Sequence, residues 1–181
     1  RMLVTMRTEI FAARSIALAN AVAIDMATAS GKEEWKARAA FLTPITKAFG
    51  TEVGMDVSEL GVQVHGGMGF IEETGAAQYS RDVRVTAIYE GTNGIQSMDL
   101  VGRKLMDGGV AAIALLDEMA DLTMSYCKLN PILGKAVWEA IQSLRNTTDW
   151  MLKQKDFNNR FAGGVPYLRA FARILGAYYD L

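Results

Sequence analysis

Apolar residues recur at helical spacing along almost the whole chain. In residues 2–30 they fall three and four positions apart, which predicts a long helix that ends near Ser30 and Gly31. The expected apolar face comprises Met2, Met6, Ile10, Ala13, Ala17, Ala21 and Ile24. We expect this face to belong to the core or to a subunit interface rather than to a cofactor site.

A second helical pattern starts near Lys32 and continues toward a pair of glycines. Thr43 followed by Pro44 is typical of a helix start, since threonine caps well and proline lacks only an N–H that would be unpaired there. We therefore expect the helix to restart at this point. Gly66 and Gly67 stop the pattern, which places Gln63 and His65 at a helix end.

Two shorter helical segments follow. Residues 72–85 predict a turn and a short helix, on which Arg81, Asp82 and Arg84 can form local ion pairs, and residues 92–105 predict a helix that starts near Thr92 or Asn93. The only cluster of β-branched residues, at 83–88, is short. The sequence therefore predicts an all-α fold in which four helical segments form an up-and-down bundle, followed by additional helices.

The run Asp107-Gly108-Gly109 predicts a domain boundary. We expect residues 1–106 to form the helical bundle and residues 107–181 to form a helical C-terminal extension. Within the extension, helical patterns cover residues 110–129, 132–161 and 166–181.

Composition and charge exclude several classes. Apolar residues make up 50% of the 181 residues, so the chain is not disordered. Its net charge is −1 and its charges are interspersed, so the chain lacks the basic patch that nucleic-acid binding requires. The single Cys127 excludes an internal disulfide and fits a reducing compartment, cytoplasm or mitochondrial matrix. Arg7, Glu9, Arg14 and Asp25 interrupt the most apolar segment, so we expect no membrane span. Because the chain begins with Arg1, we expect it to be a piece of a longer polypeptide.

Two segments are candidates for chemistry. Glu90 stands in an apolar run directly before Gly91, where a carboxylate could serve as a base, although spacing alone favours an acid that stabilises a helix N-terminus. The glycines of residues 63–70 could bring backbone amides close to a ligand, or could simply stop a helix. His65 is the only histidine and has no second ligand at metal spacing, so we expect a partly buried, hydrogen-bonded cap residue and no metal.

Three segments in this order resemble the C-terminal helical domain of the acyl-CoA dehydrogenases. They are Gln63-Val64-His65-Gly66-Gly67-Met68-Gly69-Phe70-Ile71-Glu72-Glu73, then Ser80-Arg81-Asp82-Val83-Arg84-Val85, then Ile88-Tyr89-Glu90-Gly91-Thr92. The resemblance covers residues 2–106. The closing residues 99–105 are similar to the larger family members, which carry an extra C-terminal domain.

The resemblance implies FAD-dependent α,β-dehydrogenation of an acyl-CoA thioester. It places the catalytic base at Glu90, which Ile88 and Tyr89 would help to bury, and substrate contacts at Tyr89 and Gly91. It places FAD contacts at Gln63, Val64, His65, Gly66, Gly67, Thr92, Asn93 and Gly94, in part to the cofactor of a neighbouring subunit. At Asn93 and Gly94 the sequence departs from the common family pattern, and Gly94 offers only its backbone for such a contact.

The resemblance also implies partners for the whole protein. We expect the whole protein to be a homo-dimer or tetramer that acts in fatty-acid metabolism and passes electrons to an electron-transfer flavoprotein. We expect this fragment alone to be inactive. Two alternatives stay open: an acyl-CoA oxidase that uses oxygen, and a catalytically silent helical dimerisation module.

Overall fold

The computed structural model describes residues 1–181 and contains helices but no strands, which confirms the all-α fold class. Two long helices come first, followed by short ones and then by the helices of the C-terminal region. Their bounds are α1 Met2–Ser30, α2 Glu33–His65, α3 Gly67–Phe70, α4 Ala76–Arg84, α5 Asn93–Asp99, α6 Val110–Tyr126, α7 Pro131–Lys153, α8 Phe157–Ala162 and α9 Gly164–Tyr179. Two 3₁₀ turns, η1 Glu72–Thr74 and η2 Val85–Ala87, flank α4, and a π-helical segment, η3 Leu100–Lys104, continues α5.

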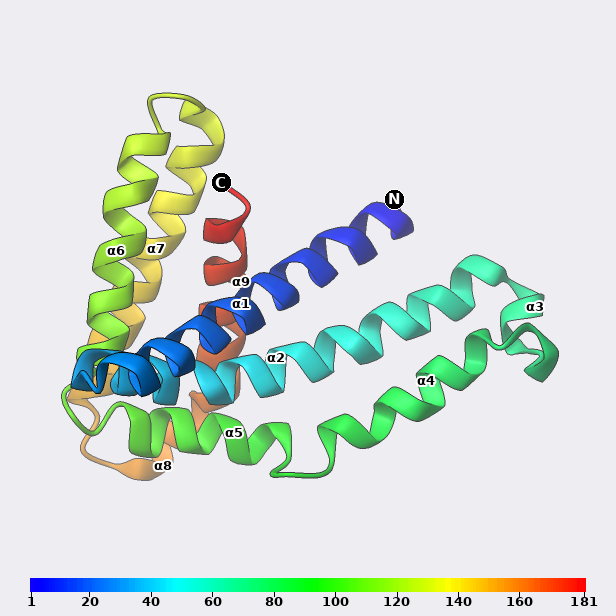
Figure 1. Ribbon diagram of the computed structural model, residues 1–181, viewed down its shortest axis with the longest axis horizontal. Coiled ribbons are helices and arrows are strands. Elements are labelled where there is room, and N and C mark those ends of the chain that lie inside the picture. The colour runs from blue at the N-terminus through cyan, green and yellow to red at the C-terminus, as the bar shows by residue number, and fades with distance from the viewer.

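Consecutive long elements run in alternate directions (Figure 1). α1 leads into α2 through the left-handed Gly31 (φ 67), and α2 then runs back beneath α1. The chain reverses again at α3, after which α4 and α5 lie end to end along α2 rather than side by side. α6 and α7 form a hairpin that rises from one end of this layer, and α9 packs against α1, α2, α5 and α7.

The packed face of α1 differs from the face that the sequence predicted. Its buried residues are Ile16, Asn20 and Ala23. Of the predicted face, Met2, Ile10, Ala17, Ala21 and Ile24 are exposed. Small side chains carry little information about which side of a helix is buried, and α2 and α9 both approach α1 on the other side. The prediction that this face belongs to the core is wrong within this chain, and its role as a subunit interface stays a prediction.

Helix α2 continues without a break through Pro44, so the predicted restart is wrong. Thr43 does not cap a new helix, because its hydroxyl donates to the Ala39 carbonyl at 2.8 Å. A proline inside a helix removes one backbone hydrogen bond. Here Leu42 and Ile45, on either side of the proline, are fully buried, and their packing holds the helix together.

One hydrophobic cluster of 24 buried residues spans the predicted boundary at 106/107. Phe41 and Leu105 from the first part belong to it together with residues of the extension, and the rings of Phe41 and Phe171 meet edge to face at 5.0 Å. The division into residues 1–106 and 107–181 stays a prediction, but the two parts share one core.

The extension departs from the sequence prediction at one point. The expected single helix over residues 132–161 is broken at residues 154–156, where the Asp156 carboxylate accepts from the Asn158 N–H at 2.9 Å and caps α8. Pro131 opens α7 with Asn130 as its cap. At the far end, α9 is joined to α2 by the pair Arg169–Glu52.

Helix α1 is the one helix that is long and apolar enough to cross a membrane by length and composition, although only 17% of its most apolar window is buried here. The core helix of a soluble protein and a signal sequence meet the same criterion. The expectation that the chain has no membrane span stays a prediction.

Candidate functional site

The segment between η2 and α5 has an unusual backbone. Glu90 has φ 52 and is the only non-glycine residue of the chain with a positive φ, and Gly91 follows with φ 83. A left-handed conformation is unfavourable for a residue with a Cβ atom, by about 1–2 kcal/mol. Such strain persists only where surrounding contacts determine the conformation, and it gathers at functional sites.

Side chains from two helices hold this segment. The Lys47 ammonium on α2 donates to the Gly91 carbonyl at 2.5 Å, and the Gln96 amide on α5 donates to the Glu90 carbonyl at 3.1 Å. Asn93 fixes the start of α5 on α2: its Oδ1 accepts from Thr51 at 3.1 Å and from Lys47 at 3.3 Å, and its Nδ2 donates to the Ala48 carbonyl at 3.3 Å.

Thr92 is the N-cap of α5, where its hydroxyl accepts from the Ile95 N–H at 3.4 Å. The helix thus starts where the sequence predicted. The backbone N–H groups of Glu90, Gly91 and Thr92 make no hydrogen bond within the chain. Three neighbouring donors are therefore free to bind a ligand.

The Glu90 side chain is exposed in this chain, and so are Ile88 and Tyr89. The prediction that these two neighbours bury the carboxylate is wrong for the chain by itself, because all three side chains of this turn are open to solvent.

The glycine corner, residues 63–67, lies at the end of α2. His65 is the last helical residue, and its Nδ1 is hydrogen-bonded to the Gly61 carbonyl at 2.8 Å. It is exposed rather than partly buried, and α2 extends past the end of α1 here (Figure 1). Gln63 and Val64 are exposed too, and a Cβ atom added at Gly66 or Gly67 would meet nothing within 4 Å.

A glycine beyond the corner has a structural role. At Gly69 a Cβ atom would lie 2.2 Å from the Val62 carbonyl oxygen, so only glycine lets α3 fold back against α2. Arg81 then joins α4 to η1 through a two-pronged bond to the Glu72 carboxylate at 3.0 and 2.7 Å. The prediction that Arg81 forms a local ion pair on its own helix is therefore wrong, because Arg81 pairs with Glu72 across the turn.

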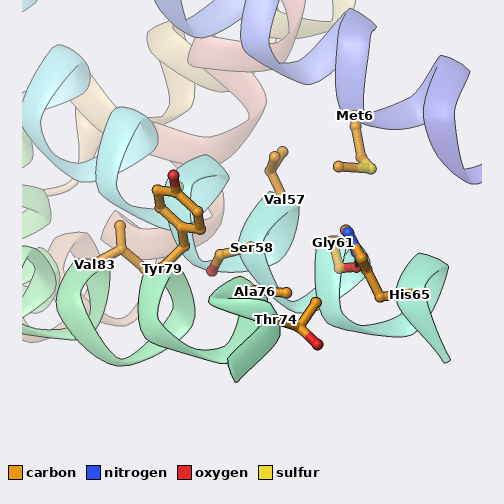
Figure 2. A pocket seen from close by; sticks show the side chains of 10 residues that line it. Met6, Val57, Ser58, Gly61, His65, Thr74, Ala76, Tyr79 and Val83 are labelled. Atoms are coloured by element: carbon orange, nitrogen blue, oxygen red, sulfur yellow. Dashed lines mark hydrogen bonds between the residues drawn. The ribbon is translucent and has the colours of Figure 1, made fainter. Parts of the chain in front are cut away.

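An apolar cleft of about 390 Å³ lies between α1, α2 and α4 (Figure 2). His65 stands at one end and the Tyr79 ring at the other, with Met6 of α1 above them. The full lining consists of Met6, Gly54, Val57, Ser58, Gly61, His65, Thr74, Ala76, Tyr79 and Val83. Glu90 is not part of this cleft.

The structure does not bring the two predicted groups of site residues together. The Glu90–Gly94 segment follows α4, whereas the glycine corner precedes it, so they lie at opposite ends of that helix (Figure 1). Within the Glu90–Gly94 segment the predicted residues are adjacent. No group of three or more His, Cys, Asp or Glu side chains is arranged to hold a metal ion.

Sequence reasoning missed Lys47, Thr51 and Gln96. A signal for the first two existed: Lys47 and Thr51 stand four residues apart, on one side of a helix whose neighbouring positions Ala48 and Phe49 are buried. Two polar residues beside the apolar stripe of a core helix indicate that this side of the helix packs against a segment with polar groups.

Comparisons with known proteins give consistent results. Residues 1–106 match the family model described as the acyl-CoA dehydrogenase C-terminal domain. The 3-methylmercaptopropionyl-CoA dehydrogenase of Ruegeria pomeroyi is 40% identical over 178 residues, which cover 93% of this chain and 30% of that protein. A butyryl-CoA dehydrogenase of Syntrophomonas wolfei is 34% identical over 185 residues, 97% of this chain and 30% of that protein.

A third relative matches a shorter part. The very long-chain specific acyl-CoA dehydrogenase of Rattus norvegicus is 33% identical over 106 residues, or 58% of this chain and 15% of that protein. The chain thus spans about a third of the length of the two relatives that match it throughout. Both of these matches extend into the C-terminal extension.

Proposed function

This chain belongs to the acyl-CoA dehydrogenase family, and from that membership we propose that the protein of which it forms part is an FAD-dependent enzyme that oxidises an acyl-CoA thioester between its α and β carbons. Glu90 is the base that removes the α proton. The observation that carries this assignment is the left-handed backbone of Glu90, which side chains of α2 and α5 hold in place.

The exposed Glu90 carboxylate can reach a ligand that binds over the segment. As the α proton leaves, negative charge develops on the thioester carbonyl oxygen, and a backbone donor aimed at that oxygen stabilises the transition state. The Glu90 N–H has no acceptor within the chain and is available for this bond. Gly91 leaves room for the Gln96 amide that holds the Glu90 carbonyl, since a Cβ atom there would lie 3.0 Å from Gln96 Nε2.

The glycine corner and the start of α5 are both open to a dinucleotide cofactor. Around Gly66 and Gly67 there is open space, so a pyrophosphate can approach their backbone, and Gln63 is exposed beside them. Thr92 and the backbone of Gly94 remain accessible, whereas the Asn93 side chain is fully engaged by α2 and would contribute only its backbone. FAD, when bound, supplies the hydride acceptor for the β carbon.

The separation of the two groups along α4 supports a homo-oligomer. In a dimer or tetramer, the glycine corner of one subunit can reach the FAD of its partner while Glu90 serves another active site. The exposed apolar side of α1 offers a surface for such contacts. We propose an electron-transfer flavoprotein as the electron acceptor, and the cytoplasm or the mitochondrial matrix as the location.

The deciding experiment replaces Glu90 by Gln in the full-length flavoprotein. We expect flavin bleaching by acyl-CoA to slow by about 10²- to 10⁴-fold, the range of general-base catalysis, with FAD content unchanged. Glu73→Gln, an exposed acid of η1, is the matched control. Undiminished bleaching in Glu90→Gln would reject the assignment of the base.

Two further measurements separate the alternatives. Oxygen consumption in step with substrate would identify an oxidase, and a colourless full-length protein that cannot be reconstituted with FAD would identify a silent helical module. A panel of thioesters that includes 3-methylmercaptopropionyl-CoA and butyryl-CoA, the compounds in the relatives' names, would define the substrate.

A further inference from the structure

We propose that Lys47 is a positioning residue for Glu90, an inference that rests on the proposed function of Glu90. Lys47 lies in the middle of α2 and is half-buried between that helix and the turn before α5. Its ammonium donates to the Gly91 carbonyl at 2.5 Å and lies 3.3 Å from Asn93 Oδ1.

The charge of Lys47 is directed at backbone rather than at an acid. Its side chain takes part in none of the ion pairs of the chain. A half-buried ammonium needs acceptors, and here they are one peptide carbonyl and one amide oxygen. Hydrogen bonds from a charged donor are roughly twice as strong as neutral ones. Lys47 therefore fixes the Gly91–Thr92 peptide more firmly than a neutral side chain would.

This peptide determines the geometry of the base. Gln96 holds the carbonyl of Glu90, and Lys47 holds the carbonyl of the next residue. With both peptide planes after the Glu90 Cα atom fixed, two consecutive left-handed residues are maintained and the carboxylate keeps one direction. An ammonium on a carbonyl also polarises the N–H of the same peptide, so the free Thr92 N–H becomes a better donor.

Asn93 attaches the turn at Glu90 to one position along α2. Its side chain accepts from Lys47 and Thr51 and donates to the Ala48 carbonyl, so the turn is held by one stretch of the helix. The strain at Glu90 is thus balanced by contacts from α2, and Lys47 provides the only charged one.

The test compares Lys47→Met with Lys36→Met in the full-length flavoprotein. Methionine keeps the length of the side chain and removes its charge, and Lys36 is an exposed lysine of the same helix that pairs only with Glu33. Hydrogen exchange is measured at Tyr89 and Gln96, whose amides bond to the Val85 and Thr92 carbonyls. We expect these amides to exchange roughly tenfold faster in Lys47→Met and unchanged in Lys36→Met, in line with the loss of a charged hydrogen bond.

Kinetics supply the second measurement. Misplacing a catalytic group lowers the rate of the chemical step more than it lowers ligand affinity. We expect the flavin-reduction rate to fall at least about tenfold in Lys47→Met, with the Kd of acyl-CoA changed less than about threefold, and Lys47→Arg to recover part of the rate.

Unchanged exchange at residues 88–96, or a loss confined to acyl-CoA affinity, would overturn the role of Lys47. Full activity of Glu90→Gln would overturn the proposed function instead. The two failures are distinguishable because the exchange measurement reports on the turn whether or not Glu90 is the base.

Discussion

At the scale of single residues, Glu90 shows a conflict between stability and the proposed chemistry. Its backbone adopts a conformation that favours glycine, and it is followed by a glycine that is also left-handed. A side chain with a Cβ atom at this position therefore costs folding free energy, which contacts from Lys47 and Gln96 offset. Retaining a glutamate in such a place is understandable if its side chain has a function.

A pair of substitutions measures this cost. Glu90→Gly and Glu90→Ala both remove the carboxylate, but only glycine adopts φ 52 without strain. We expect Glu90→Gly to be more stable than Glu90→Ala by about 1 kcal/mol in urea unfolding. Equal stability, or a more stable alanine variant, would mean that the turn relaxes and that its backbone is not strained.

At the scale of elements, α2 is the scaffold of the molecule. It contacts α1, α3, α4, α5, α6 and α9, positions the turn through Lys47, and ends in the glycine corner. On the side that meets α9 it carries Glu52, Asp56 and Glu59, and Arg169 of α9 pairs with Glu52. Desolvation, and then repulsion by Glu52, Glu59 and Glu9, raises the pKa of Asp56 above its ordinary value.

This charged face gives a pH-dependent prediction. Because the folded protein binds the Asp56 proton more tightly than the unfolded chain does, ionisation of Asp56 lowers stability as pH rises through its raised pKa. We expect Asp56→Asn to be slightly more stable at pH 7, within about 0.5 kcal/mol for so exposed a position. The difference should vanish near pH 3, where the carboxyl is protonated in both states. Thermal unfolding across this range is the measurement, and an advantage that grew at low pH would contradict it.

At the scale of the whole molecule, the C-terminal extension is part of the core rather than an appendage. The buried cluster joins α1 and α2 to α6, α7 and α9, and Phe171 of α9 packs between Phe41 and Tyr167 with ring centroids at 5.0 and 6.0 Å. The helix that carries the turn, α5, contacts α9 directly. The extension therefore supports the position of the proposed active-site segment.

Phe171→Ala tests this shared core. Phe171 is 0% exposed, and removing a buried aromatic ring costs about 3–5 kcal/mol of unfolding free energy. Phe157→Ala, at a residue of α8 that is 45% exposed, should cost less than about 1 kcal/mol. Urea unfolding of both variants checks the prediction. A loss of less than about 1 kcal/mol in Phe171→Ala would contradict the shared core.

The sequence by itself determined the helical class, most helix bounds and the order of the motifs. Helical spacing, the caps Thr92 and Asn130, and the glycine stops at Gly31 and Gly66 are local features, and they act through local backbone geometry. The three motif segments were also readable in sequence, because they are contiguous. The prediction of a helix start at Pro44 was wrong, because the packing of Leu42 and Ile45 outweighs the local preference of proline for the first helical position.

Only the tertiary structure decided which face of α1 is buried, that the extension shares the core, and how the turn at Glu90 is held. Lys47 and Gly91 are far apart in sequence and meet because α4 and α5 run back along α2. The left-handed backbone of Glu90 follows from that meeting. Contacts between distant segments depend on how all the helices pack together, and a local pattern of apolar and polar residues does not contain this information.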